Sequence, residues 1–158
     1  MDYALKTQKS ALTQSPLQGS DAASSGKNAN VPLRVLMVED SPHWQEAIQS
    51  LVGMIPGLTL LSCVDNFEDA LAFYNQNLAG PSEARVNLAL LDFQIQGAKS
   101  GLDVAKALCA KGFAQERIVI VSSSPPSLIG EHPYGYVPKS RVFEELAVAI
   151  AGIANLPL

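Results

Sequence analysis

Polar residues directly follow four short apolar runs of the sequence, and their types suit phosphoryl chemistry on a carboxylate. In chain order, these residues are Glu39 and Asp40, Asp92, Ser122 and Lys139. Carboxylates are ligands that a hard cation such as Mg²⁺ prefers, whereas a hydroxyl and an ammonium group suit phosphoryl oxygens. We therefore expect Ser122 to donate a hydrogen bond to one phosphoryl oxygen and Lys139 to neutralise another.

Asp92 follows the most uniformly apolar run and is the candidate nucleophile, because a carboxylate can take a phosphoryl group to form an acyl phosphate. Such a transfer depends on in-line geometry and neutralised oxygens more than on acid–base help. Repulsion among Glu39, Asp40 and Asp92 would favour a bound divalent cation. The sequence thus predicts an Mg²⁺ site made of these carboxylates, a backbone carbonyl near Gln94 and water.

The apolar runs are expected to be parallel strands whose carboxyl ends bring these side chains together. Short apolar runs flanked by turn residues are typical of buried parallel strands, and open α/β sheets bind ligands along the carboxyl edge. The expected strands are Leu33–Val38, Leu58–Val64, Val86–Leu91, Arg117–Val121 and Gly135–Pro138.

Helical segments alternate with the expected strands. They run from Pro42 to about Met54, from a cap at Asp65 to about Asn77, from Gly101 to Ala110 after a cap at Ser100, and from a cap at Ser140 to about Ile153. The last helix is expected to bury Val142, Phe143, Leu146, Ala147 and Ile150. This alternation predicts a doubly wound α/β fold with a five-stranded parallel sheet covered on both faces.

One segment breaks the alternation, where a fourth helix would be expected. Three prolines and a glycine lie between Ser122 and Tyr136, and they exclude a regular helix of normal length. We predict a loop, or a single turn near Ser127–Gly130, so that the fourth helix is shortened or replaced.

Composition narrows the class of protein. The net charge is −4 and no basic stripe is visible, which disfavours nucleic-acid binding. The longest apolar stretches are far shorter than a membrane span, and the first residues lack the apolar core of a secretory signal. We expect a cytoplasmic protein with no nucleic-acid or membrane partner.

The first 30 residues differ from the rest of the chain. They are rich in Ser, Gln, Ala, Asn and Gly, which predicts a flexible leader over residues 1–30 and one domain over residues 31–158. Cys63 and Cys109 match no metal-site spacing. They are expected to be two buried free thiols, with a disulfide as the alternative.

Four stretches of the sequence resemble the receiver domain of two-component response regulators. They are Val38–Ser41, Leu91–Asp92, Val121–Ser122 and Tyr136–Lys139, and the resemblance extends from about residue 33 to residue 153. Their order and spacing make the signal stronger than any single match. The resemblance implies a flavodoxin-like fold of the receiver type.

The resemblance also implies roles for six residues. It assigns the acidic metal pair to Glu39 and Asp40, the phosphoacceptor to Asp92, the switch hydroxyl to Ser122, the site lysine to Lys139 and the rotating aromatic to Tyr136. The chain departs from the family pattern in several places, among them a longer loop before the third expected strand and the shortened fourth helix. Gln96 stands where a proline is usual, and Ser140 follows the lysine where a proline joined by a cis bond is usual.

By resemblance, the chain is a stand-alone receiver that takes a phosphoryl group from a phosphohistidine on a histidine kinase or a histidine phosphotransfer protein. It would then change its affinity for a downstream protein target, and it would not be an enzyme beyond slow self-dephosphorylation. A phosphorylation-independent binding module of the same fold is the alternative. An aspartate-nucleophile phosphohydrolase is disfavoured, because Gln94 stands where such enzymes carry a second Asp as general acid.

Overall fold

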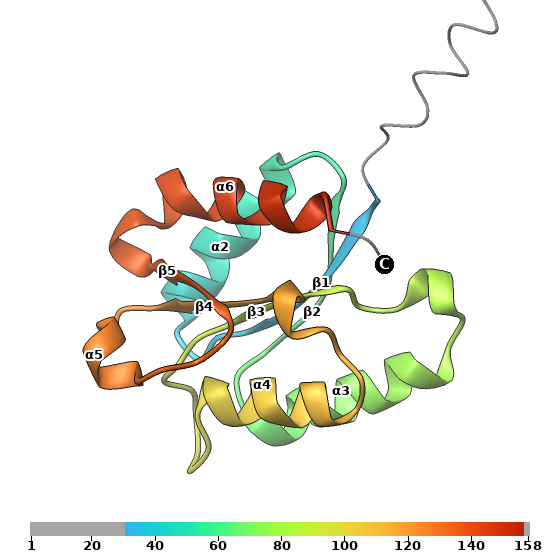
Figure 1. Ribbon diagram of the computed structural model, residues 1–158, viewed down its shortest axis with the longest axis horizontal. Helices are drawn as coiled ribbons and strands as arrows, with labels where there is room; N and C mark the ends of the chain where they lie inside the picture. The colour runs from blue at the N-terminus through green and yellow to red at the C-terminus, as the bar shows by residue number, and fades with distance from the viewer. Residues whose placement is uncertain (1–30, 157–158) are drawn as a thin grey trace, which may run out of the picture. The chain divides into compact units, whose positions relative to one another are not determined.

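The computed structural model of the chain describes residues 31–156, and five parallel strands form one sheet within them (Figure 1). The strands are β1 (Leu33–Val38), β2 (Leu58–Val64), β3 (Leu88–Leu91), β4 (Ile118–Ser122) and β5 (Gly135–Pro138). Their order is β2-β1-β3-β4-β5, which is that of the flavodoxin-like doubly wound fold. The predicted fold class is therefore confirmed.

Helices cover both faces of this sheet. Helices α2 (Pro42–Met54) and α6 (Val142–Ala154) lie on one face, and α3 (Phe67–Ala79) and α4 (Gly101–Ala110) lie on the other (Figure 1). The short helix α5 (Pro126–Ile129) lies between β4 and β5 in the sequence. Single 3₁₀ turns occur at Ser82–Ala84, Gln115–Arg117 and Lys139–Arg141.

Two hydrophobic clusters join the layers, one on each face of the sheet. The first contains Ile48 of α2 and Leu146 of α6, and the second contains Tyr74 of α3 and Leu108 of α4. The inner strands β3 and β4 are buried along their whole length. Burial on both faces explains why these strands are continuous apolar runs rather than alternating ones.

Some strand and helix ends differ from the predicted ones. Strand β3 begins at Leu88 rather than Val86, because the Asn87 side chain accepts the backbone hydrogen bond of Arg34 at 2.6 Å and replaces a strand partner there. Strand β4 is shifted by one residue toward its carboxyl end. Asn66, not Asp65, caps α3, and that helix continues to Ala79.

The predicted start of the last helix is wrong. Lys139–Arg141 forms a 3₁₀ turn, and α6 begins at Val142 without a side-chain cap, so Ser140 is not its N-cap. Phe143 is 63% exposed rather than buried. The buried face instead repeats every three or four residues, as a helix requires, through Val142, Leu146, Ile150 and Ile153.

The shortened fourth helix is confirmed. Helix α5 is a single turn that ends at Gly130, whose φ of +86° suits glycine. Ile129 anchors the turn in the second hydrophobic cluster. No peptide bond between residues 31 and 156 is cis.

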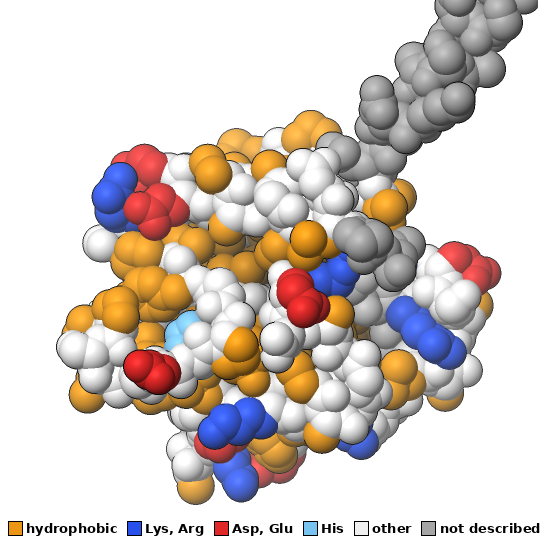
Figure 2. All heavy atoms as spheres, viewed as in Figure 1, with side chains coloured by type: hydrophobic (Ala, Val, Ile, Leu, Met, Phe, Trp, Pro, Cys, Tyr) orange, Lys and Arg blue, Asp and Glu red, His pale blue; other side chains and the backbone are white. Residues whose placement is uncertain are grey.

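An apolar groove lies beside this altered segment. Hydrophobic side chains gather between α6 and α5 on the face shown in Figure 2. A cavity of about 300 Å³ lies between β5 and α6, and its lining residues are Tyr136, Val137, Glu144, Glu145, Val148 and Ala149.

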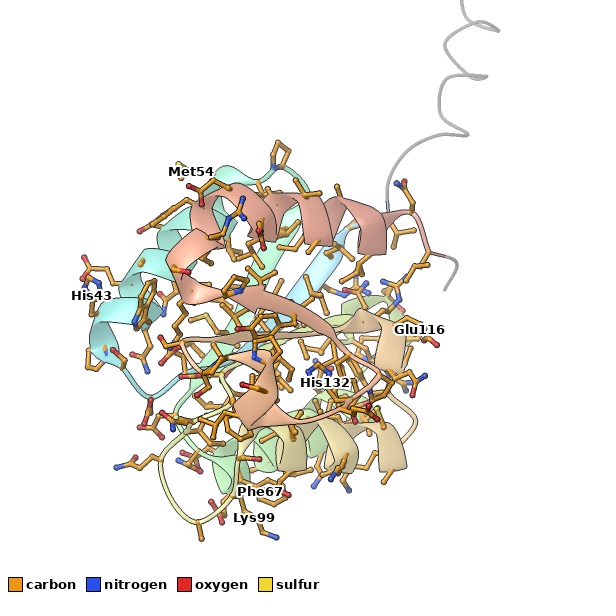
Figure 3. The ribbon with its side chains drawn as sticks, turned by 60° about the vertical axis from the view of Figure 1, so that its left-hand side comes forward. His43, Met54, Phe67, Lys99, Glu116 and His132 are labelled. Atoms are coloured by element: carbon orange, nitrogen blue, oxygen red, sulfur yellow. The ribbon has the colours of Figure 1, made fainter. Side chains whose placement is uncertain are left out.

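The cysteines and histidines do not form a site. Cys63 and Cys109 are free thiols, as expected, but they are partly rather than fully buried. Burial raises the pKa of both thiols, which disfavours reactive thiolates. His43 and His132 lie on separate parts of the molecule (Figure 3). Within the described part of the chain, no helix is long and apolar enough to cross a membrane.

The predicted leader, residues 1–30, lies outside the described residues. We expect its deletion to leave the Tm within a few degrees, because its sequence offers few large apolar side chains to bury. Thermal unfolding of the full chain and of a chain starting at residue 31 would measure the difference. A large drop in Tm would show instead that the leader docks on the domain.

Candidate functional site

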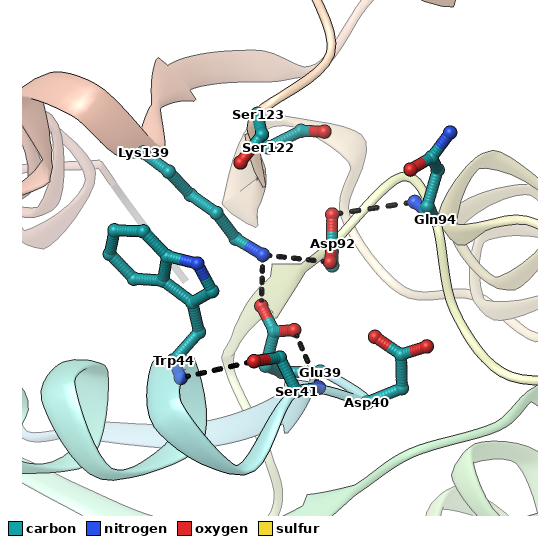
Figure 4. A pocket seen from close by; sticks show the side chains of 9 residues that line it. All are labelled: Glu39, Asp40, Ser41, Trp44, Asp92, Gln94, Ser122, Ser123 and Lys139. Atoms are coloured by element: carbon teal, nitrogen blue, oxygen red, sulfur yellow. Dashed lines mark hydrogen bonds and ion pairs between the residues drawn. The ribbon is translucent and has the colours of Figure 1, made fainter.

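A pocket of about 300 Å³ lies at the carboxyl edge of the sheet (Figure 4). The strands β1, β3, β4 and β5 all end at it. Its lining residues are Glu39, Asp40, Ser41, Trp44, Asp92, Gln94, Ser122, Ser123 and Lys139. The structure therefore brings together the residues predicted to do chemistry, except Tyr136, which lies outside the pocket.

Backbone hydrogen bonds fix the two acidic strand ends beside each other. The Asp92 N–H donates to the Val38 carbonyl at 2.9 Å, and the Glu39 N–H donates to the Val64 carbonyl at 2.9 Å. Both side chains are buried, with exposed fractions of 6% for Asp92 and 1% for Glu39. The parallel ladder thus carries these two carboxylates into one pocket.

The start of α2 holds the first acidic segment in place. Ser41 is the N-cap of this helix and Pro42 is its first residue, a position that suits proline. Glu39 Oε1 accepts a hydrogen bond from the Ser41 N–H at 3.0 Å, and Gln45 Nε2 donates to the Glu39 carbonyl at 2.6 Å. Glu39 therefore has one side-chain oxygen fixed and one facing the pocket.

Lys139 joins the acidic strand ends from the opposite side of the pocket. Its Nζ lies 2.6 Å from Glu39 Oε2 and 2.8 Å from Asp92 Oδ2 (Figure 4). The Lys139 side chain is only 5% exposed, so water screens these ion pairs weakly. Burial raises the pKa of the Glu39 carboxyl, and the contact with Lys139 partly opposes that rise.

The acidic residues fit a hard divalent cation. Glu39, Asp40 and Asp92 each offer an oxygen, and these three oxygens lie within 4.8 Å of one another. Glu39 Oε2 forms an ion pair with the Lys139 ammonium but is not aligned for a hydrogen bond. Among the described residues, it is the one buried side-chain oxygen or nitrogen atom without a hydrogen-bond partner. Three carboxylates and one ammonium leave a formal charge of −2 in the pocket, which a divalent cation would neutralise.

The Gln94 segment closes the pocket next to Asp92. The Gln94 backbone N–H donates to Asp92 Oδ1 at 3.3 Å, while Asp92 Oδ2 faces Lys139. The two oxygens of Asp92 are thus held by different partners, which fixes the plane of the carboxylate.

Ser122 and Tyr136 are joined through one residue of the next loop. Ser122 Oγ accepts a hydrogen bond from the Ser124 N–H at 3.1 Å, and the Tyr136 hydroxyl donates to the Ser124 carbonyl at 2.8 Å. Ser122 is buried in the pocket wall. Tyr136 is therefore connected to the pocket through the backbone of Ser124 and not by direct contact.

Three pocket residues, Ser41, Ser123 and Trp44, were given no role in the site from the sequence. Ser123 follows Ser122 and lines the pocket. Trp44 also lines it, with its ring 5.2 Å from Lys139 Nζ, whereas its neighbour His43 is exposed. Trp44 is the third residue of α2, whose Ser41 cap directly follows the acidic pair, and this closeness in sequence is a signal that could have placed the indole near Glu39 and Asp40.

Comparisons with known proteins identify the fold. No family model and no curated protein sequence matches the chain. Among solved structures, the receiver domain of the putative response regulator NarL from Mycobacterium tuberculosis matches with a TM-score of 0.63 and 19% identity, covering 80% of this chain and 99% of that one. The chain has the fold of response regulator receiver domains.

Other solved structures agree on the receiver fold. A LuxR-family two-component response regulator from Aurantimonas sp. SI85-9A1 matches with a TM-score of 0.61 and 21% identity, covering 77% of this chain and 84% of that one. The response regulator domain of CheB from Thermotoga maritima matches with a TM-score of 0.61 and 16% identity, covering 80% of this chain and 98% of that one. The receiver fold thus extends over most of the described residues.

Proposed function

We propose that this chain is a phosphoacceptor signalling domain that takes a phosphoryl group onto Asp92. The observation that carries the proposal is the buried Lys139 ammonium, which contacts Asp92 Oδ2 and Glu39 Oε2 in one pocket of a receiver fold. An ammonium group beside a carboxylate nucleophile can move its contact to the phosphoryl group that the nucleophile receives and neutralise charge there.

The donor in this proposal is a phosphohistidine on a histidine kinase or a histidine phosphotransfer protein. An Asp92 oxygen attacks the phosphorus, the phosphorus–nitrogen bond breaks, and the imidazole leaves with the electron pair. Lys139 then neutralises one phosphoryl oxygen. The Ser122 hydroxyl donates a hydrogen bond to another, because its Oγ can keep accepting from the Ser124 N–H while its own O–H turns to the phosphoryl group.

The carboxylates of the pocket fit a bound Mg²⁺, which would neutralise charge on the phosphoryl oxygens. Glu39, Asp40, Asp92 and the backbone carbonyl of Gln94 would hold it. Asp40 is the exposed member of the acidic group, so its carboxylate is open to a cation that enters from solvent.

Mg²⁺ is expected to raise the Tm of the parent protein without any phosphoryl donor, because it relieves repulsion among buried carboxylates. At ten times the Kd, the gain in unfolding free energy should be about 1.4 kcal/mol. Asp40→Ala should lose most of this response. Glu46→Ala is the matched control, since Glu46 is exposed on α2 and outside the pocket. A parent Tm that does not change in millimolar Mg²⁺ would count against the site.

Intact mass after incubation with acetyl phosphate and Mg²⁺ tests the proposed function. A persistent mass increase of one phosphoryl group is the expected result. Release of phosphate with steady turnover would identify a phosphohydrolase instead, and that outcome is not expected because Gln94 offers no carboxyl as general acid. No mass change would favour the phosphorylation-independent module.

One observation favours the phosphorylation-independent binding module as the second candidate. The Tyr136 hydroxyl donates to the Ser124 carbonyl at 2.8 Å, an interaction that involves none of the residues lining the acidic pocket. The groove between β5 and α6 lies beside it. A partner could therefore bind this surface in a single conformation. The module differs from the receiver in one measurable property, because its partner affinity would not change on phosphorylation.

In the receiver proposal, phosphorylation acts by ordering residues 123–134. The local backbone hydrogen bonds of this segment are those of a single turn, from Leu128, Ile129 and Gly130, and segments with few such bonds open easily. Beryllofluoride, a phosphoryl mimic, should therefore slow hydrogen exchange in residues 123–134. Exchange that slows only on another face would contradict this mechanism. Helix α4 is the internal control, because it packs in the second cluster and should be protected in both states.

A further inference from the structure

The indole ring of Trp44 lies against the ammonium group of Lys139. The Nζ atom is 5.2 Å from the ring centroid (Figure 4). This distance is within the range of a cation–π interaction, which is strongest for tryptophan. Lys139 is 5% exposed, and such an interaction strengthens when the cation is removed from water.

Three groups surround the ammonium, and two of them change during the proposed reaction. Glu39 Oε2 and Asp92 Oδ2 lie at 2.6 and 2.8 Å, and both carboxylates belong to the acidic group that could hold a cation. Asp92 also receives the phosphoryl group. The attraction of these carboxylates for the ammonium therefore falls as the reaction proceeds, whereas that of the uncharged indole does not.

The Trp44 side chain is itself held in place. It packs against the hydrophobic cluster between the sheet and helices α2 and α6. The Trp44 backbone N–H donates to Ser41 Oγ in the cap of α2, which fixes the main chain at this residue. The His43 ring meets the indole edge-on with centroids 5.4 Å apart. The ring is thus a fixed surface beside a flexible lysine.

We propose that Trp44 is a positioning residue, whose indole face keeps the Lys139 ammonium beside Asp92 while the carboxylates change partners. The inference rests on the proposed function of Asp92 as phosphoacceptor. Trp44 acts through Lys139 and does not touch the reacting atoms. Its removal therefore slows phosphoryl uptake only when Lys139 is present.

A double-mutant cycle on the full chain tests this role through the rate of uptake from acetyl phosphate. Trp44→Leu should slow uptake by about twofold to thirtyfold, the range set by cation–π energies. Trp44→Phe, which keeps an aromatic face, should slow uptake less than Trp44→Leu does. In a Lys139→Met background, Trp44→Leu should have no further effect, because there is no ammonium to hold. Phe143→Leu is the control for loss of an aromatic ring, since Phe143 is exposed on α6.

Each outcome of the cycle decides between alternatives. Equal slowing by Trp44→Leu in both backgrounds would mean a purely structural role and would overturn the inference. If the parent takes up the phosphoryl group and Trp44→Leu does so at the same rate, the inference is overturned but the proposed function stands. No uptake by the parent would overturn the proposed function, and the positioning role with it.

Fluorescence provides a second measurement that does not need phosphoryl transfer. Trp44 is the only tryptophan of the chain, so its emission comes from this pocket. Without Mg²⁺ or a phosphoryl donor, Lys139→Met should shift the emission of Trp44, because a cation next to the ring is removed. An unchanged spectrum would show that the ring and the ammonium are not in contact and would overturn the inference directly.

Discussion

Asp92→Asn should abolish phosphoryl uptake completely. An amide is not a nucleophile toward phosphorus, whereas the Asp92 carboxylate is and lies beside the Lys139 ammonium at 2.8 Å. The substitution keeps the size of the side chain, and Lys139 retains its ion pair with Glu39 at 2.6 Å. The loss should therefore come from chemistry rather than from a disrupted pocket.

Intact mass and peptide mapping after incubation with acetyl phosphate and Mg²⁺ would measure this loss. Asp65→Asn is the matched control, because Asp65 follows β2 at the same edge of the sheet but does not line the pocket. It should take up one phosphoryl group like the parent. A phosphoryl group mapped to Asp40 or Ser122, or uptake that persists in Asp92→Asn, would refute the assignment of the acceptor.

Elements whose start or burial is determined locally could be predicted from the sequence. Helix α4 begins at Gly101 as predicted, because Ser100 and Asp103 bond reciprocally to each other's backbone N–H groups. Strand β1 has its predicted bounds because, apart from Arg34, it is apolar and buried on both faces. The proline-rich segment after β4 forms a single turn for the local reason that proline cannot continue a helix.

Ends that depend on partners distant in sequence could not be predicted. The start of β3 is set by a hydrogen bond between Asn87 and Arg34, which are 53 residues apart. The exposure of Phe143 depends on which side of α6 faces the sheet. The 3₁₀ turn before that helix changes which of its residues point inward. Neither the pattern of apolar residues nor the position of Ser140 contains that information.

Part of the candidate site could likewise be predicted from the sequence, and part could not. Parallel strands place their carboxyl ends along one edge, so the meeting of Glu39, Asp92 and Lys139 follows from the strand pattern. The contact of Trp44 with Lys139 depends on side-chain conformations and could not be derived from it. The link from Tyr136 through Ser124 likewise depends on the path of a loop that has no regular structure to predict.

The backbone of Asp92 is also positioned by a residue that carries no chemistry. Gly101, the first residue of α4, packs directly against the peptide that follows the acceptor, and its N–H donates to the Phe93 carbonyl at 2.8 Å. A Cβ atom at this position would lie 1.9 Å from the Asp92 carbonyl oxygen and 2.8 Å from its carbonyl carbon. Neither atom belongs to a flexible side chain, so either the helix or the acceptor strand would have to move.

Gly101→Ala is therefore expected to lower the free energy of unfolding by about 3 kcal/mol or more, at the upper end of what overpacking costs. Urea unfolding would measure the loss, with Gly152→Ala as control. Gly152 lies within α6 with open space around it, so alanine there should raise stability by up to about 1 kcal/mol. Equal effects of the two substitutions would contradict the close approach of α4 to Asp92. Because the displaced atoms belong to the acceptor residue itself, Gly101→Ala should also slow phosphoryl uptake in the molecules that remain folded, whereas Gly152→Ala should not.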